Sequence, residues 1–471
     1  MIMHSQPRTF ALEPRNRRRW CAIALLGYLC ASAAARADDA ADTPAPPTIR
    51  FAPCPATITA REDDRPPPDI EVVPGVYCLF VRFRDGRLYG MGENRIGTLG
   101  IGDAPATREP QRITDKPIRT VASYSHTLLV TEDGALLGTG ENYHGQLGLG
   151  DLETRFELAT IVDKGVVDAA VGRWCSMFLK KDGTLWAMGD NKNGILGVGN
   201  PHRMGGSSTF TEGKDAKTPV RVDTDVVSLA MSNNMALYLK KDGTLWASGL
   251  EPILQPGNPL NIPRKIYSGD FIKATCTSST VFLLKPDGSL WSMGAHYGGA
   301  LGRETDGPSA EWGVVCKTGV TDVVGNSRRY SAVYFTEDGA AWGVGEISGG
   351  KPRKLPIPAA RVVSLGPGEN LLMLDRNGAA WGTGKNTSLM LNPKDRRKTF
   401  NKPVRIFPGT TATDIASIPF ASFAIDDNGA LWTVGWSPDP SMGGEPFHLE
   451  DEDQRLASPT PRRIRLPDRV N

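Results

Sequence analysis

The phrase Asp182-Gly183-Thr184-Leu185-Trp186, followed by Gly189, is one of eight copies of the pattern that decides the fold of this chain. In every copy a large residue lies four positions after an Asp or Asn, and a Gly lies seven positions after it. The copies are 39 to 60 residues apart and begin at Asp85, Asp133, Asp182, Asp242, Asp287, Asp338, Asn377 and Asn428. Such fixed offsets indicate eight repeats of one structural unit.

Each copy predicts a β-hairpin. Asp-Gly and Asn-Gly suit the two positive-φ positions of a type I′ turn. In seven copies an apolar residue stands three positions before the turn, as Leu179 does before Asp182. A lone hairpin is only marginally stable in water, so the repeats are expected to bury their faces against one another. A β-sandwich with repeated turns is the alternative, although a sandwich does not need a fixed Trp and Gly in every hairpin.

A second regular segment lies between the hairpins. Short edge strands that begin at a proline, where the missing N–H is harmless, are expected at Pro110, Pro219, Pro263 and Pro403. A further apolar strand follows, as in Val226–Leu229, which gives about four strands in each unit. We therefore expect an all-β propeller with four-stranded blades, eight in number, with seven as the alternative.

The chain finishes with Pro461-Arg462-Arg463-Ile464-Arg465-Leu466, a copy of the edge-strand phrase that no hairpin follows. The first hairpin, in turn, has no such phrase clearly before it. We expect the C-terminal strand to complete the first blade and so to close the ring, which would also remove two exposed sheet edges.

Residues 1–37 are predicted to be a signal peptide. A basic start at Arg15–Arg19 precedes an apolar run from Trp20 to Ala34 and an Ala-x-Ala site at 35–37. The run is too short to favour a stable membrane span, although an uncleaved anchor is the alternative. Periplasmic or secreted localisation follows. Residues 38–70, rich in Pro and Ala, are predicted to be a linker or extended arm, and residues 71–471 the propeller.

The charge and the cysteines narrow the possible partners. The predicted leader holds six Arg and one Glu, so its removal changes the formal net charge from +2 to about −3. This balance gives no electrostatic case for nucleic acid. The remaining cysteines, an odd number without a Cys-x-x-Cys spacing, are Cys54, Cys78, Cys175, Cys276 and Cys316. Some could pair after export, but buried structural thiols are the favoured interpretation.

No reaction chemistry is evident. The Gly-rich segments after the hairpins lack the Gly-Lys-Ser/Thr ending of a phosphate-binding loop. The His residues outside the leader are scattered without metal-ligand spacing. The repeated Trp could form a sugar-stacking platform, but a position facing the next blade is more naturally core. We predict no catalytic residue, cofactor or metal, and do not expect an enzyme.

The loops at the hairpin ends opposite the Asp-Gly turns are predicted to form one binding face. They differ from unit to unit, as binding loops on a regular frame do, and they contain the Trp, Tyr and Arg that dominate interfaces. The candidate partner-binding residues are Tyr124, His126, Tyr143, His144, Arg173, Trp174, Asn233, Asn234, Arg328, Arg329, Tyr330, Glu369 and Asn370. Solvated turns without a partner are the alternative at each position. The protein is expected to be a monomer.

The segment Gly140-Glu141-Asn142-Tyr143-His144-Gly145-Gln146-Leu147-Gly148-Leu149-Gly150-Asp151 resembles the regulator-of-chromosome-condensation repeat family. The resemblance covers roughly residues 71–470 and suggests an exported bacterial member. It implies a β-propeller, usually of seven blades, whereas eight hairpins are present here. Within the family, a nuclear member is a guanine-nucleotide exchange factor and a secreted bacterial relative inhibits β-lactamase. The predicted signal argues against the first role, and nothing in the loops identifies the second.

These observations predict a non-catalytic exported scaffold that binds a protein or peptide through the loops of one propeller face. An envelope glycan-binding propeller and a propeller-type lyase or hydrolase are the alternatives. The fold alone does not distinguish them.

Overall fold

The computed structural model describes residues 50–51, 57–58, 70–191, 194–199, 215–249, 260–357, 360–365, 370–386, 390–392, 395, 399–419, 421–435, 458–464 and 466. All of them belong to one compact unit, Pro47–Asn471. The predicted signal peptide and most of the predicted linker lie outside the described residues. Among those described, no helix has the length and apolar character needed to cross a membrane.

Eight sheets make up the described part of this unit, each built on four antiparallel strands that follow one another along the chain, and two of the sheets have a short fifth strand. Blades 1 to 4 comprise β3 (Ile70–Pro74), β4 (Cys78–Phe83), β5 (Leu88–Glu93) and β6 (Ala106–Thr114); β7 (Ile118–Ser123), β8 (His126–Thr131), β9 (Leu136–Gly140) and β10 (Arg155–Val162); β11 (Val166–Val171), β12 (Cys175–Lys180), β13 (Leu185–Gly189) and β14 (Ala216–Asp223); and β15 (Val226–Met231), β16 (Met235–Lys240), β17 (Leu245–Gly249) and β18 (Leu260–Tyr267).

Blades 5 to 8 comprise β19 (Lys273–Cys276), β20 (Thr280–Leu284), β21 (Leu290–Gly294) and β22 (Ser309–Cys316); β23 (Val320–Gly325), β24 (Ser331–Thr336), β25 (Ala341–Gly345) and β26 (Arg353–Lys354); β27 (Ala360–Leu365), β28 (Asn370–Asp375), β29 (Ala380–Lys385) and β30 (Thr399–Ile406); and β31 (Ala412–Ile418), β32 (Ala421–Asp426), β33 (Leu431–Gly435) and β34 (Ser458–Ile464). Two 3-10 turns, η3 (Tyr297–Gly299) and η4 (Glu346–Ser348), lie in the loops.

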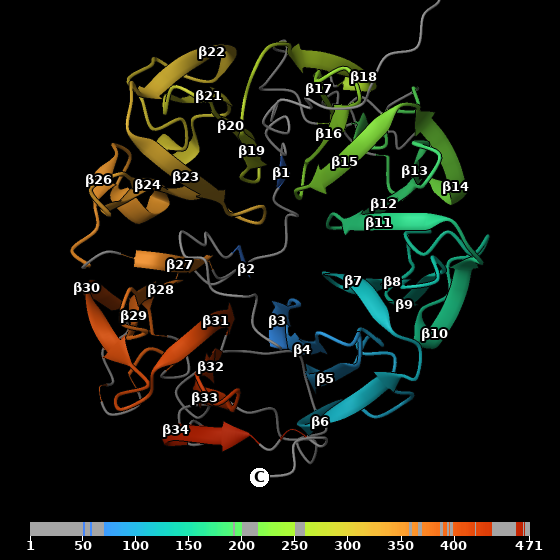
Figure 1. Cartoon of the computed structure of the whole chain (residues 1–471). Helices are drawn as coiled ribbons and strands as arrows, with labels where there is room; N and C mark the ends of the chain where they lie inside the picture. The colour runs from blue at the N-terminus through green and yellow to red at the C-terminus, as the bar shows by residue number, and fades with distance from the viewer. Residues whose placement is uncertain are drawn as a thin grey trace, which may run out of the picture. The chain divides into compact units, whose positions relative to one another are not determined.

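The blades are arranged in chain order around a common centre, with the first strand of each blade innermost and the fourth outermost (Figure 1). The all-β propeller with eight blades is therefore confirmed, and the seven-bladed alternative is not. The Pro-containing segments are the outermost strands, as predicted for edge strands: Pro110 lies in β6, Pro219 in β14, Pro263 in β18 and Pro403 in β30.

The C-terminal strand has a different partner from the one expected. β34 pairs with β33 and completes blade 8, whereas blade 1 obtains its outermost strand, β6, from its own segment of the chain. The outermost strand follows its hairpin in every unit, so the last edge-strand phrase belongs to the last hairpin. The ring closes by side-chain packing instead. Ile70 and Val72 of β3 share one buried cluster with Ile418 and Phe423 of blade 8.

The core consists of eight apolar clusters in the described part of the chain, one at each boundary between neighbouring blades. Leu185 of β13 is typical, since it is fully buried in the cluster between blades 3 and 4. Burying one such Leu contributes about 1.5–3 kcal/mol. No blade could bury its faces alone, so the repeats stabilise one another.

The Asp-Gly turns are longer than predicted. In blade 3 the N–H of Gly183 donates to the carbonyl of Lys180 (2.9 Å), and the N–H of Lys180 donates to the carbonyl of Thr184 (3.0 Å). Three residues thus form the loop, with Gly183 at φ +84°, while Asp182 is not among the described residues of positive φ. This is a type I turn followed by a Gly bulge rather than a type I′ turn. Only the Gly needs the left-handed conformation.

The Asp and Trp of the repeated phrase are joined by hydrogen bonds. Asp182 Oδ1 accepts from the N–H (2.9 Å) and the hydroxyl (2.7 Å) of Thr184, whose Oγ1 accepts from the indole N–H of Trp186 (2.9 Å). Blades 4 and 5 repeat this chain of bonds. Blades 7 and 8 lack the hydroxyl, and there the indoles donate to Asp375 (3.1 Å) and Asp426 (2.8 Å).

The six repeated Trp are partly buried against the inter-blade clusters, as the core interpretation predicts. They face the preceding blade rather than the next one: Trp186 of blade 3 packs on the cluster between blades 2 and 3. In blades 3, 4 and 6 the ring also stacks on an aromatic residue of the preceding strand, as Trp186 does on Phe178 with ring centroids 6.3 Å apart. These rings are therefore structural.

Two short strands come from the stretch that the sequence indicates as a linker. β1 (Arg50–Phe51) pairs in parallel with β19 of blade 5, and β2 (Thr57–Ile58) pairs antiparallel with β27 of blade 7. Both partners are innermost strands, so these two segments lie at the centre of the ring (Figure 1).

The described cysteines are free thiols. Cys78, Cys175 and Cys276 are buried and Cys316 is partly buried. Burial raises the pKa of Cys78 to about 12, which keeps this thiol protonated and unreactive. These positions agree with structural thiols, and Cys54 lies outside the described residues.

Candidate functional site

The loops between the first and second strands of each blade, called inner loops here, share one end of the blade with the connections between the third and fourth strands, called outer loops. Antiparallel strands in chain order require this arrangement. Backbone bonds tie the two sets together: Glu93 N–H donates to the carbonyl of Tyr77 (3.0 Å), and Asp190 N–H to that of Trp174 (2.9 Å). We call this end the loop face and the opposite end the turn face.

Outer loops of blades 1, 2, 3 and 7 are organised by a buried Asn. In blade 2, Asn142 Oδ1 accepts from the N–H of Leu147 (2.9 Å), and its Nδ2 donates to the carbonyl of Asp151 (3.2 Å). The same Asn–Leu bond, five residues apart, occurs at Asn94, Asn191 and Asn386. The neighbouring Tyr143 and His144 are thereby held at the protein surface, where Tyr143 is 62% exposed.

The inner loop of blade 6 reaches across the centre of the ring. Arg328 donates from Nη1 to the carbonyl of Gly75 in blade 1 (3.1 Å) and from Nη2 to that of Ser123 in blade 2 (2.8 Å). Its guanidinium also lies 4.7 Å from the centre of the Tyr124 ring. The carbonyl of Arg328 accepts from Asn233 Nδ2 (3.4 Å) in blade 4. Arg328 therefore joins inner loops from opposite sides of the ring.

A cavity of about 750 Å³ opens on the loop face over blades 1 to 3. Its aromatic lining consists of Tyr77, Tyr124 and Trp174, and its charged lining of Glu93, Arg95, Glu141 and Arg173. Tyr124 is held by Arg328 from across the ring, and the Trp174 ring carries the Arg173 guanidinium 4.3 Å from its centre. The walls are thus fixed by side-chain contacts on either side of the cavity.

Limited access of water alters the acids of this cavity. Burial raises the pKa of Glu93, with Arg95 opposing the shift. Burial, together with the charge of Glu93, also raises the pKa of Tyr77. Groups in such an environment interact more strongly with a charged ligand than groups in open water do.

A second cavity of about 420 Å³ lies between blades 6 and 7 on the same face. Arg329, Glu346 and Lys385 are among its charged lining residues. The Arg329 Nε and Glu346 Oε2 atoms are 3.8 Å apart. Its wall has one aromatic side chain, Phe400, and it is the smaller site.

The candidate binding residues separate into three groups. Tyr124, Arg173 and Trp174 line the larger cavity, and His144 packs against Trp174 with ring centroids 5.3 Å apart. Asn233, Asn234 and Arg328 are engaged in bonds between inner loops, including Asn234 Nδ2 to Ser278 Oγ (3.1 Å). Arg329 lines the smaller cavity, and the ring of Tyr330 packs against that of Tyr297 with ring centroids 5.2 Å apart. Glu369 lies outside the described residues.

Two of the candidates are core residues, which corrects their expected place on the surface. His126 is fully buried, its Nε2 lies 2.7 Å from Ser176 Oγ of blade 3, and burial lowers its pKa to about 3. Asn370, at the start of β28, is also buried; it pairs with Gly384 and lines the smaller cavity. Each is the first residue of a second strand, a position that the repeat places inside the blade.

Sequence reasoning missed several cavity residues, among them Tyr77, Glu93 and Arg95. The repeat itself held a signal for the first. Tyr77 directly precedes Cys78, which pairs with Gly92, just as Trp174 precedes Cys175, which pairs with Gly189. Aligning the units on the Gly of the repeated phrase would have shown that Tyr77 holds the same position in blade 1 as Trp174 does in blade 3.

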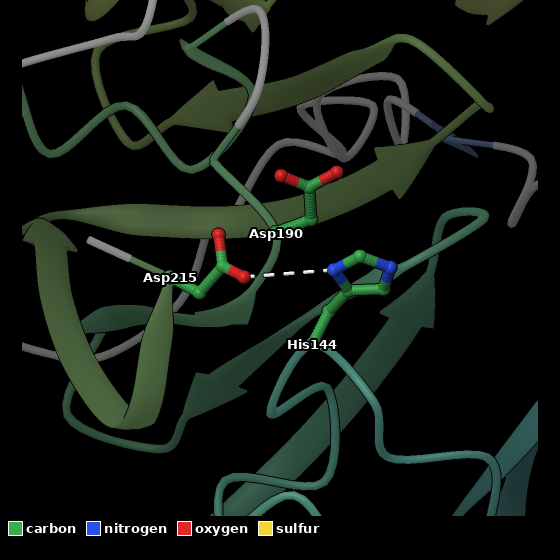
Figure 2. A group of neighbouring side chains, drawn as sticks. All are labelled: His144, Asp190 and Asp215. Carbon is green, nitrogen blue, oxygen red and sulfur yellow. Dashed lines mark ion pairs between the residues drawn. The ribbon is translucent and has the colours of Figure 1, made fainter. Parts of the chain in front are cut away.

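His144 from the outer loop of blade 2 lies close to Asp190 and Asp215 from that of blade 3 (Figure 2). The His144 ring also contacts Trp174 of the larger cavity. His144 Nδ1 and Asp215 Oδ2 are 3.5 Å apart. One donor atom from each residue lies within 4.8 Å of the others, and Asp190 is 4% exposed. The sequence could not reveal this group because its members come from three separate segments.

Residues 118–146 and 133–179 match the regulator of chromosome condensation (RCC1) repeat. No curated protein matches this chain. Human WBSCR16 is 17% identical, over 76% of this chain and 91% of its own, with a TM-score of 0.48. Prp20p from Saccharomyces cerevisiae is 17% identical, over 73% of this chain and 80% of its own, with a TM-score of 0.48. The structure of yeast RCC1 (Prp20) with Kap60 is 17% identical, over 74% of this chain and 78% of its own, with a TM-score of 0.49. The eight four-stranded blades make this chain a β-propeller, and residues 118–179 of it resemble the RCC1 repeat.

Proposed function

We propose that this RCC1-like β-propeller is a non-catalytic scaffold, exported by its leader, that binds a protein or peptide in the loop-face cavity of blades 1 to 3. One observation carries the proposal. The cavity, of about 750 Å³, combines three aromatic walls with charges of both signs on the face where the repeats differ from one another. The turn face, by contrast, repeats the same hydrogen bonds from blade to blade.

The residue types fit a polypeptide partner. Tyr, Trp and Arg contribute most to protein interfaces: Tyr and Trp offer large contact areas with few rotatable bonds, and Arg offers a planar group of N–H donors. Tyr77, Tyr124 and Trp174 would bury an apolar side chain of the partner. Glu93, Arg95 and Glu141 would then pair with its charged or backbone polar groups. Because the cavity has two acidic and two basic residues, a partner of one dominant charge would be repelled as often as attracted. We therefore expect the partner's surface to carry charges of both signs.

Glycan binding is the second candidate, and the exposed rings of Tyr77 (39%) and Tyr143 (62%) favour it. Sugar stacking needs an open aromatic face. The Trp174 ring, however, carries Arg173 over it and contacts His144. This favours a polypeptide over a glycan as the occupant.

A lyase or hydrolase would require polar groups that converge on the centre of the ring. The described inner loops there are joined by Arg328, which donates to two backbone carbonyls and lies over a Tyr ring. Carbonyls held in this way act as structural acceptors, which supports the proposal of a non-catalytic scaffold.

The test is capture of partners from periplasmic and secreted fractions by immobilised residues 38–471, followed by mass spectrometry. The double variant Tyr77→Ala/Trp174→Ala should lose the captured partner, with a reduction of at least about tenfold, as expected when two anchor residues are removed. Tyr297→Ala is the matched control, because Tyr297 is a 56% exposed aromatic residue on the same face outside this cavity. It should bind like the unaltered chain.

Equal capture by the double variant and the control would contradict the proposed cavity. Binding to a glycan array without any captured protein would instead favour the second candidate. The mass of the chain recovered from these fractions tests export, because cleavage after Ala37 removes residues 1–37.

A further inference from the structure

We propose that His144, Asp190 and Asp215 form a binding site for a divalent transition-metal ion of the Zn²⁺ class, which joins the outer loops of blades 2 and 3. The proposal does not depend on the proposed function. It rests on the donor set, on the spacing of the donor atoms and on a backbone scaffold that holds them together (Figure 2).

The donor set favours a transition metal over Mg²⁺ or Ca²⁺. One imidazole nitrogen and two carboxylate oxygens are ligands that Zn²⁺ uses, whereas Mg²⁺ and Ca²⁺ prefer oxygen alone. Two carboxylates and a neutral imidazole carry a formal charge of −2, which a divalent ion neutralises. Three protein ligands also leave positions of the ion open to water or to another ligand.

The spacing is close to that of a loaded site. With bonds of about 2.0–2.2 Å, the ligand atoms of a tetrahedral Zn²⁺ ion lie about 3.2–3.6 Å apart. His144 Nδ1 and Asp215 Oδ2 are already 3.5 Å apart. The donors as a whole lie within 4.8 Å of one another, so closing the site requires a movement of about 1 Å, within reach of side-chain rotation.

The backbone around the site fixes the donors in place. The N–H of Asp190 donates to the carbonyl of Trp174 (2.9 Å), and the N–H of His144 to Gln146 Oε1 (2.9 Å). The loop of blade 2 lies directly on blade 3: a Cβ at Gly145 would be 2.8 Å from Lys217 Cα, and the N–H of Gly150 donates to the carbonyl of Lys217 (2.9 Å). This contact brings His144 beside Asp215.

The site adjoins the larger cavity through Trp174. This residue contacts the His144 ring with its side chain and accepts the Asp190 N–H with its carbonyl. A bound ion would therefore hold Trp174, part of the cavity wall, in place through its side chain and through its backbone carbonyl. Blades 2 and 3, which are joined by packing and by hydrogen bonds, would also be joined by coordination.

The test uses residues 38–471, freed of metal by chelation and dialysis, and titrated with Zn²⁺, Mn²⁺ and Ca²⁺ while calorimetry and thermal unfolding are followed. We expect one Zn²⁺ ion per chain and a rise in Tm of at least about 2 °C at saturating Zn²⁺. Asp215→Asn should weaken Zn²⁺ binding at least about 100-fold. Asp306→Asn, which removes the same charge from an exposed position in the outer loop of blade 5, should bind Zn²⁺ normally.

The metal-free Tm separates a metal ligand from a merely structural residue. Asp215→Asn should leave it unchanged or raise it, because the substitution relieves the proximity of two carboxylates. The proposal is overturned if Zn²⁺ shifts the Tm of Asp215→Asn as much as that of the unaltered chain. It is equally overturned if Ca²⁺ binds as tightly as Zn²⁺. Partner capture with and without chelator is scored separately, so failure of the metal site and failure of the cavity can be told apart.

Discussion

The two ends of each hairpin obey different rules. At the turn face, the Asp–Thr–Trp bonds of blade 3 recur in blades 4 and 5, and all of their atoms lie within five consecutive residues. At the loop face, backbone bonds between inner and outer loops also recur, but the side chains of the inner loops have different partners from blade to blade. Arg328 there bonds to residues 205 and 253 positions away in the chain. Local interactions thus repeat, while long-range contacts make each blade distinct, and the candidate sites lie where the contacts are long-range.

The largest expected effect comes from two glycines of blade 3, one at each end of the hairpin. Gly189, at the loop end, has φ +103°, and a Cβ there would lie 2.5 Å from the carbonyl oxygen of Trp174. Gly183, at the turn end, has φ +84°, but its Cβ would be 3.5 Å from the nearest atom. Gly189→Ala should lower the free energy of unfolding by about 3 kcal/mol or more, because a backbone clash adds to the left-handed strain.

Gly183→Ala is the matched control and should cost about 1 kcal/mol, the price of the left-handed conformation alone. Urea unfolding of both variants measures the difference. Equal destabilisation would mean that the loop end is no more tightly packed than the turn end, and would remove the basis of the comparison.

Arg328 provides the next test. Arg328→Ala removes two hydrogen bonds from a charged donor and the contact with the Tyr124 ring, and should lower the free energy of unfolding by about 2–3 kcal/mol. Arg328→Lys should recover only part of this loss, because an ammonium group cannot present two N–H groups in a fixed fork. If urea unfolding shows no loss for Arg328→Ala, the contacts across the ring do not stabilise the loop face.

The third test uses pH and the buried His126. Burial lowers its pKa to about 3, whereas an unfolded His has a pKa of about 6.5. Between these values the unfolded chain binds a proton that the folded chain does not, so stability is fully present above pH 6.5 and decreases as the pH falls. From pH 6.5 to pH 5 the expected loss is about 2 kcal/mol.

Partly buried Asp168 acts in the opposite direction. Burial raises its pKa to about 6, so its folded form holds a proton that the unfolded chain releases above about pH 4. Comparing the unaltered chain with His126→Gln at pH 7 and pH 5 removes this common contribution. The unaltered chain should lose about 2 kcal/mol more than the variant, and identical losses would show that His126 takes up its proton without unfolding.

Most of the fold could be predicted from the repeated phrase, and the errors have physical causes. The turn type was wrong because Asp-Gly is compatible with both a two-residue and a three-residue loop, and only Gly183 has a positive φ. The C-terminal strand was placed in the wrong blade because its phrase was compared with the first hairpin rather than with its own. In blade 7 the loop kept the Asn386–Leu391 bond although its Gly pattern had disappeared from the sequence.

The candidate site was harder to predict. Trp174 and Tyr124 were recognised as loop residues, but His126 was not recognised as core, although it pairs with Gly140 as buried Cys175 pairs with Gly189. Tyr77 belongs to the least regular repeat and was missed. Asp190 and Asp215 carry no signal in the sequence, because neither is near His144 along the chain.

By itself, the sequence determined the hairpins, their number and the way each blade is made from consecutive strands. Those features depend on interactions within a few tens of residues, and they occur eight times. Only the tertiary structure decided that Arg328 reaches Gly75 and Ser123, that three aromatic side chains enclose one cavity, and that His144 meets Asp190 and Asp215. The reason is geometric: these contacts join different blades, and their distances are set by how the blades pack around the ring.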